Sequence, residues 1–354
     1  MSSYISDSEF EKIMNNPKLS LPVRWNGRDF ETSVDELLKE YLCELHTAIK
    51  RNENEYVGRN IEVRINEIDR VSVLLRQCIS KYHRGLPSNA YTALKKAMGI
   101  LMKAPIRIYT KTGWTEPFKK DRLHLFRMRK AGDSAKHVRE DLFHVPASQR
   151  EKISTCRYSI AGYPSLYLTT SIELGLKEIG DQTRNVIVSL YKVKRNQQKE
   201  KIKVLELGIR PTDFSGNKNN RFKDFDEVDL KNKDVRSSYL LWYPLIAVCS
   251  FIRAYKDKPF ASEYIVPQMF MQWVRKQAKQ DELTGIRYFS CASILAADVG
   301  FDYVFPVNNT NYRGKYCSIL RDSFLLTDPI FLCDYPSIDC AEQELVKCEK
   351  LETI

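Results

Sequence analysis

The spacing of apolar residues changes near Pro105, and this change constrains the fold more than any other feature of the chain. Upstream of Pro105, apolar side chains recur every three or four residues, which is the spacing of amphipathic helices. The expected helices run from a cap at Thr32 or Ser33 to Ile49, from Ile61 to Ile79, and from Pro87 to Leu101. Downstream, shorter alternating runs favour strands. The sequence therefore predicts an α+β protein in which a helical bundle precedes a mixed α/β part.

The part after Pro105 contains several short strand candidates and two further helices. The strands are expected at 106–109, 125–128, 166–168, 186–193, 202–207, 285–290 and 303–305, with one or two more in 318–332. Helices are expected at 238–254 and 262–276, and a polar surface loop at 210–233. We therefore divide the chain into a helical domain at 1–105, a mixed domain at 106–332 and an acidic tail at 333–354.

The sequence contains neither a recognisable signal peptide nor an apolar run long enough to span a membrane. The amino terminus has acidic residues and no apolar core of a signal peptide. The longest apolar run, Tyr239 to Ile252, contains Pro244 and is too short to cross a bilayer. We expect a cytoplasmic protein that does not contact a membrane.

Common catalytic motifs are missing from the sequence. The nine cysteines contain no Cys-x-x-Cys pair, which fits neither a zinc site nor a disulfide framework, so we expect reduced thiols and no bound metal. The sequence has no glycine-rich dinucleotide-binding or P-loop motif. If the protein binds a nucleotide, arginine side chains must hold the phosphates.

The positive charge, formally +11 for the chain, is concentrated between Arg107 and Arg157, where 13 basic residues face 6 acidic ones. Clustered Lys and Arg suit nucleic acid, a phosphate-rich small molecule, or simply a solvated basic face. Aromatic residues that could stack on bases are only loosely interleaved with these charges. We therefore rank an anion-binding site above a nucleic-acid surface and expect no nucleic-acid partner.

The stretch from Arg157 to Glu178 is the strongest candidate for chemistry. Gly162 and Pro164 break the backbone before the short apolar run 166–168, and Ser171 can cap a following helix. In this loop, strand and helix, Arg157, Tyr167 and Glu178 could converge on one site. The alternative is structural, with Tyr167 in the core and Glu178 on a solvated helix face paired to Arg157, and composition alone favours it.

Four short motifs together resemble the RES domain, a family named for its Arg, Glu and Ser. They are Leu-Phe-Arg at 125–127, Arg-Tyr-Ser-Ile-Ala-Gly at 157–162, Leu-Tyr-Leu at 166–168 with Glu178, and Gly-Ile-Arg-Tyr-Phe-Ser at 285–290. The resemblance covers about two-thirds of the chain. It implies a split sheet related to that of ADP-ribosyltransferases and an enzyme that degrades NAD+. The helical first third resembles the HEPN-like domain of longer members.

The resemblance also implies roles for individual residues. Glu178, Arg157 and Tyr167 would be catalytic, and Arg127, Tyr158 and Ser290 would bind substrate. Glu178 would stabilise positive charge on the ribose, while arginines would contact phosphate oxygens in bidentate fashion. The acceptor would be water or inorganic phosphate as a co-substrate, and no cofactor is implied.

Two other functions remain open at this point. The same pocket could transfer ADP-ribose to a macromolecule, or the helical third could be a HEPN-type ribonuclease or RNA-binding module using Arg76 and His83. We prefer a scaffold, regulatory or oligomer-forming role for the helices. In biological terms, the resemblance implies a bacterial toxin or defence effector with a cognate antitoxin or immunity protein as partner.

Overall fold

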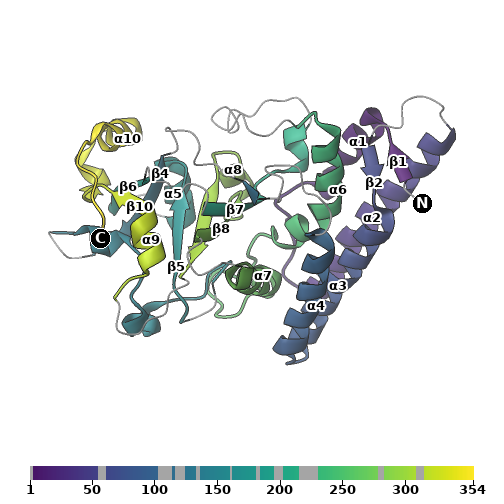
Figure 1. Cartoon of the computed structure of the whole chain (residues 1–354), viewed down its shortest axis with the longest axis horizontal. Helices are drawn as coiled ribbons and strands as arrows, with labels where there is room; N and C mark the ends of the chain where they lie inside the picture. The colour runs from purple at the N-terminus through teal and green to yellow at the C-terminus, as the bar shows by residue number, and fades with distance from the viewer. Residues whose placement is uncertain are drawn as a thin grey trace. The chain divides into compact units, whose positions relative to one another are not determined.

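The computed structural model describes residues 3–54, 61–102, 114–115, 124–132, 136–159, 162–180, 184–194, 202–214, 230–277, 283–307 and 315–354. These residues form two compact units, and each unit combines two segments of the chain (Figure 1). The first unit comprises Met1–Thr115 and Ile209–Trp273, and the second comprises Glu116–Gly208 and Val274–Ile354. A helical region and a mixed sheet confirm the predicted α+β class.

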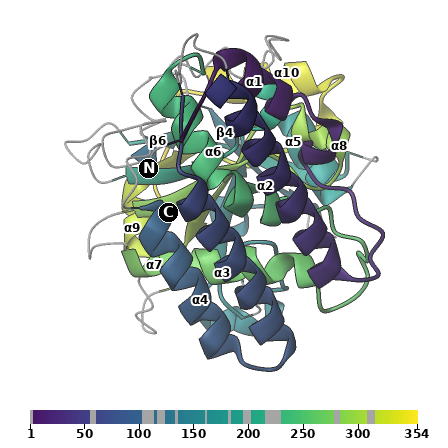
Figure 2. The same cartoon turned by 90° about the vertical axis from the view of Figure 1, so that its right-hand side faces the viewer.

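The first unit is mainly helical. Its helices are α1 (Asp7–Met14), α2 (Phe30–Asn54), α3 (Ile65–His83), α4 (Pro87–Leu101) and α6 (Lys233–Val248), and α7 (Ile265–Gln277) begins in it. Its strands β1 (Ser3–Ile5) and β2 (Ile61–Val63) pair antiparallel, and β3 is Trp114–Thr115. Figures 1 and 2 both show α2, α3 and α4 lying alongside one another. Gly85, at a φ of +76°, allows the tight turn between α3 and α4.

Two predicted helix starts in the first unit are wrong. Helix α2 begins at Phe30, because the Asp29 carboxylate accepts from the Thr32 N–H at 3.1 Å and so caps the helix in place of Thr32 or Ser33. Ile61 lies in β2 opposite Ile5, so α3 starts only at Ile65. In both cases a partner outside the apolar pattern decides the boundary.

The segment after Ile209 packs with the amino-terminal helices, which differs from the contiguous ranges expected. Within the predicted surface loop, the described part holds a 3-10 helix at Pro211–Phe214. Phe214 is buried between Phe10 and Tyr239, with ring centroids 5.0 and 4.7 Å away. Helix α6 is apolar on nearly all sides, and the hydroxyl of Tyr41 donates to the Leu240 carbonyl at 2.6 Å. A helix that is apolar on nearly all sides must be surrounded by other elements, and those of the first unit bury α6.

The second unit is built on a mixed sheet. The strands are β4 (Leu125–Lys130), β5 (Ser165–Thr169), β6 (Val186–Val193), β7 (Ile202–Leu207), β8 (Leu283–Tyr288), β9 (Asp302–Pro306), β10 (Phe324–Leu326) and β11 (Ile330–Phe331). Their order is β10-β6-β4-β5-β9-β8-β7, and β11 also pairs with β6. Strand β7 runs parallel to β8, and the other neighbours in this order are antiparallel. The strand expected at 106–109 lies outside the described residues.

The sheet is nearly interrupted between β4 and β5. Strand β4 pairs with β6 along its whole length and β5 pairs with β9 along its whole length. In contrast, β4 and β5 share the single residue pair Phe126 and Thr169. Beyond that pair, the polar groups of the two strands need other partners, and side chains can supply them.

Helices and the carboxyl-terminal segment complete the second unit. They are α5 (Ile172–Ile179), α8 (Ile294–Ala297), α9 (Ser318–Ser323) and α10 (Ile338–Lys347), and 3-10 turns lie at Arg139–Leu142, Ala147–Lys152 and Leu332–Asp334. Phe126 and Val188 of the sheet, Ile172 of α5 and Leu345 of α10 belong to one buried cluster. The segment expected to be an acidic tail is therefore part of the core of this unit. Among the described residues, no helix is both long and apolar enough to span a bilayer.

Candidate functional site

A tight turn presents the first two candidate residues. Cys156 and Ser159 exchange backbone hydrogen bonds of 3.1 and 3.3 Å, which places Arg157 and Tyr158 at the two central positions of the turn. Both side chains are buried, with exposed fractions of 9% and 1%. The Tyr158 ring packs on that of Tyr288 in β8, with centroids 4.7 Å apart. The turn thus directs an arginine and an aromatic ring into the protein.

Helix α5 positions Glu178. The Ser171 hydroxyl accepts from the Leu174 N–H at 3.2 Å, which confirms the predicted cap, and Gly180 ends the helix with a φ of +68°. Glu178 lies in the last turn and is exposed. Its carboxylate nevertheless accepts a hydrogen bond from the fully buried Ser290 hydroxyl. One face of Glu178 therefore meets solvent while one oxygen is held by the protein.

Ser290 has a defined orientation. The Ala292 N–H donates to the Ser290 oxygen at 3.2 Å, and the Ser290 hydroxyl in turn donates a hydrogen bond to Glu178. Ser290 lies two residues after the end of β8, and its side chain is fully buried. This arrangement brings together the glutamate and serine that the sequence motifs singled out.

Asp302 is a residue that sequence analysis missed. It is the first residue of β9 and lies in register with Thr169 of β5 and Tyr288 of β8. Its exposed fraction is 5%. Burial, followed by the neighbouring Glu178, raises the pKa of Asp302 well above its usual range. A carboxylate immediately before the predicted strand 303–305 was the signal available, but only the tertiary structure makes it a neighbour of Glu178.

Electrostatic effects on two further side chains show which candidates are neighbours. Burial raises the pKa of Tyr288, and Asp302, Glu178, Tyr167 and Tyr158 raise it further. Burial also raises the pKa of the Cys291 thiol to about 11, an effect that Arg157 opposes and Glu178 reinforces. Arg157 and Glu178 therefore act on the same group. The high pKa keeps Cys291 a neutral thiol and a poor nucleophile at neutral pH.

Tyr167 lies on β5 at the interrupted edge of the sheet. Its hydroxyl and that of Ser159 are 2.6 Å apart, which links the strand to the turn that carries Arg157. Its backbone carbonyl accepts from Arg127 Nη1 at 2.8 Å. The Arg127 side chain thus replaces the backbone partner that β4 no longer offers at this point.

Arg127 is a cation without an acidic partner among the described residues. Its Nε is buried and makes no hydrogen bond in this part of the chain. Burial and then the nearby Arg129 lower the pKa of Arg127 to about 10. Directly opposite on β6, the buried Ser189 hydroxyl also has no hydrogen-bond partner among the described residues. Such an arrangement leaves positive charge and donors free for an anion.

The structure thus assembles five of the six candidates in one neighbourhood of the second unit: Arg157, Tyr158, Tyr167, Glu178 and Ser290. Arg127 joins them through the Tyr167 carbonyl. Their assigned roles stay predictions. Among the described residues, no group of three or more His, Cys, Asp or Glu side chains is placed to hold a metal ion.

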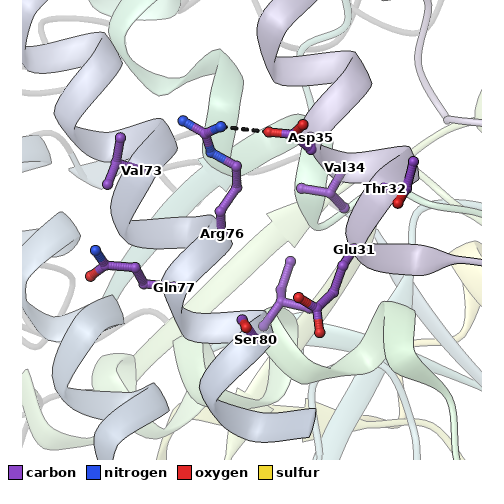
Figure 3. A pocket seen from close by; sticks show the side chains of 9 residues that line it. Glu31, Thr32, Val34, Asp35, Val73, Arg76, Gln77 and Ser80 are labelled. Carbon is purple, nitrogen blue, oxygen red and sulfur yellow. Dashed lines mark hydrogen bonds and ion pairs between the residues drawn. The ribbon is translucent and has the colours of Figure 1, made fainter. Parts of the chain in front are cut away.

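The residues of the possible ribonuclease motif lie elsewhere, in the first unit. Arg76 lines a pocket of about 410 Å³ between α2 and α3 and forms an ion pair with Asp35 (Figure 3). The two ring nitrogens of His83 bond Glu31 at 2.8 Å and Ser262 at 3.1 Å. Both side chains therefore already have partners inside this unit.

Comparison with curated proteins finds one from Bacillus subtilis (strain 168) that is named "Putative toxin YopC". The two sequences are 29% identical over 324 residues, which span 88% of this chain and 68% of that protein. No protein-family model and no solved structure matches the chain. The chain is thus similar to a protein named as a toxin, and its RES and HEPN resemblances stay predictions.

Proposed function

We propose that the second unit cleaves the bond between nicotinamide and ribose in NAD+, with water or inorganic phosphate as the acceptor. The observation that carries this proposal is the Glu178 carboxylate, open to solvent on one side and held by the buried Ser290 hydroxyl on the other. Arg157, Tyr158 and Tyr167 belong to the same neighbourhood, because Arg157 and Glu178 both act on Cys291, and Tyr158, Tyr167 and Glu178 all act on Tyr288. These residue types suit a ligand that combines a cationic ring, a ribose and phosphates.

The glutamate would act on the ribose. Breaking the bond leaves positive charge spread over the ribose carbon and ring oxygen, and a fixed carboxylate stabilises that charge as it develops. The Ser290 hydrogen bond fixes the carboxylate before the substrate arrives. Nicotinamide departs as a neutral molecule, so its departure needs no proton from a strong acid.

The arginines would hold the phosphates. NAD+ carries a pyrophosphate, and guanidinium groups bind such oxygens through paired N–H donors. Arg157 is buried and acts, like Glu178, on the Cys291 thiol, and Arg127 offers a buried Nε that has no hydrogen-bond partner among the described residues. Tyr167 would pack against the nicotinamide or ribose, and the Tyr158 ring would support this wall together with Tyr288.

We further propose that the protein is a toxin that acts by depleting NAD+, with an antitoxin or immunity protein as its partner. The similarity to a protein named as a toxin supports this role. Transfer of ADP-ribose to a macromolecule would use the same groups and differs only in the acceptor. The helical unit would then serve as a scaffold or an oligomer contact.

The test is to incubate purified protein with NAD+, with and without inorganic phosphate, and to identify all products by chromatography. We expect free nicotinamide together with ADP-ribose, or with its 1″-phosphate when phosphate is the acceptor. Glu178→Gln should reduce nicotinamide release strongly. Absence of nicotinamide release from folded wild-type protein would refute the activity, whereas ADP-ribose bound to protein or nucleic acid would establish the transferase.

A further inference from the structure

Strand pairing sets Asp302 opposite Tyr288 of β8, and Ser290, two residues after Tyr288, binds Glu178. Asp302 and Glu178 are thus neighbours, and a side-chain hydrogen bond joins them. Ionised carboxylates only accept hydrogen bonds, so a hydrogen bond between these two groups requires one proton. Asp302 Oδ2 is buried and has no hydrogen-bond partner among the described residues. Without the proton, this oxygen would be an unsatisfied buried charge beside a second negative group, which is strongly unfavourable.

The location of this proton follows from burial. Asp302 is almost wholly buried, whereas Glu178 is exposed at the end of α5. Charge is least costly where water can solvate it, so the proton belongs on Asp302 and the negative charge on Glu178. Ser290 already donates to Glu178 from a second direction.

The groups near Asp302 and Glu178 are consistent with a proton on Asp302. From β5 the Thr169 hydroxyl favours the charged form of Asp302, and from β8 the neutral Tyr288 phenol lies in register with it. Both carboxylates raise the pKa of the Cys291 thiol, which lies three residues after β8, and Arg157 lowers it. Among the described residues that change the pKa of Asp302, none is a cation.

We propose that Asp302 is a positioning residue that donates its carboxyl proton to Glu178, so that two donors, Asp302 and Ser290, hold a singly charged Glu178 in place. The catalytic consequence rests on the proposed function, while the shared proton itself does not. When Asp302 loses this proton at high pH, two like charges face each other. Glu178 should then turn toward solvent and lose its fixed orientation.

The first test needs no substrate and compares stability against pH for the wild type and Asp302→Asn. A carboxyl group whose pKa is raised on folding keeps a proton that the unfolded chain releases, so stability falls as pH rises above about 3.9, the ordinary value for Asp, toward the folded pKa. Asparagine cannot titrate and still donates an N–H to Glu178. We expect the melting temperature of Asp302→Asn to rise relative to the wild type between pH 4 and pH 8.

Two variants sharpen this test. Asp298→Asn removes an exposed carboxylate four residues away and should leave the pH dependence of the wild type unchanged. Glu178→Gln supplies an amide donor to Asp302, so it should remove most of the same pH dependence, and combining it with Asp302→Asn should add little. Parallel stability curves for the wild type and Asp302→Asn would overturn the proposal.

The second test follows NAD+ consumption. We expect Asp302→Ala to lower kcat by about tenfold or more with a smaller effect on KM, since a donor to a charged group is lost. Asp302→Asn should recover part of that kcat and lack the alkaline loss of activity that the wild type shows. An alkaline limb that persists in Asp302→Asn would contradict the proposal. If the wild type consumes no NAD+ but the stability curves differ as expected, the shared proton stands and the proposed function fails.

Discussion

The buried hydroxyl of Ser290 donates a hydrogen bond to the carboxylate of Glu178, although 112 positions separate the two residues in the chain. This contact ties the last turn of α5 to the end of β8. It turns an exposed glutamate on a helix into a carboxylate with a fixed direction. Fixed orientation before binding is what an electrostatic catalyst requires.

Removal of this donor should slow turnover. Hydrogen bonds to charged groups contribute roughly 1.5–3 kcal/mol, so we expect Ser290→Ala to lower kcat about 10- to 100-fold with little change in KM. The measurement is steady-state release of nicotinamide from NAD+. Ser323→Ala is the matched control, because that hydroxyl bonds the Ile319 carbonyl and, among the described residues, no other group. Equal losses in the two variants would show that the Ser290 hydroxyl has no special role.

Arg127 should matter for binding more than for stability. Its side chain is half-buried and has no acidic partner in the described part of the chain, so replacing it with Met removes a partly desolvated charge together with one bond to the Tyr167 carbonyl. We expect the free energy of unfolding of Arg127→Met to stay within about 1 kcal/mol of the wild type. The KM for NAD+ should rise about tenfold or more, as phosphate contacts are lost. A stable variant with unchanged KM would exclude Arg127 from the binding site.

Arg287, in contrast to Arg127, should matter for the stability of the sheet. It forms a fully buried ion pair with Glu206 on the neighbouring strand and covers the Phe301 ring at 4.7 Å. Arg287→Met leaves Glu206 charged and buried, so we expect a loss of roughly 3–5 kcal/mol in chemical denaturation. Adding Glu206→Gln should restore part of that loss. If the single variant were as stable as the wild type, the ion pair would not hold β7 to β8.

His144 should make the second unit sensitive to acid. Burial, with Arg127 and Arg129 nearby, lowers the pKa of His144 to about 4, and its Nε2 accepts from the Cys317 N–H at 2.9 Å. His144 in the unfolded chain binds a proton near pH 6.5, whereas the folded protein keeps the imidazole neutral down to about pH 4. The stabilisation is therefore complete above pH 6.5 and decreases as the pH falls toward 4. The shift corresponds to about 3 kcal/mol.

Hydrogen exchange at the Cys317 amide measures this effect locally. We expect its protection to decrease from pH 6.5 to pH 4 after correction for the intrinsic exchange rate. His144→Gln should flatten this pH dependence, at a lower protection overall. The exposed His46 is the control, and His46→Gln should behave like the wild type. A flat profile in the wild type would show that His144 is protonated in the folded protein.

Local features of the fold could be predicted from the sequence. Strands β6 and β7 occupy the predicted ranges 186–193 and 202–207, and Ser171 caps α5 as expected. Each of these features depends on neighbours a few residues away, through alternation of apolar side chains or a bond to a nearby N–H. The motifs around Arg157, Glu178 and Ser290 were likewise visible in the sequence, although their assembly was not.

Tertiary contacts decided the rest. Strand pairing between β5, β9 and β8 sets Asp302 opposite Thr169 and Tyr288, where Glu178 of α5 is also its neighbour. The packing of apolar helix α6 joins residues 209–273 to the amino-terminal helices. The Asp29 cap and the pairing of Ile61 with Ile5 moved helix boundaries in the same way. The apolar pattern shows which face of an element is buried, but it does not name the partner that buries it. The sequence alone therefore determined the elements and most candidate residues, and only the pairing register and packing of distant segments determined which charges meet.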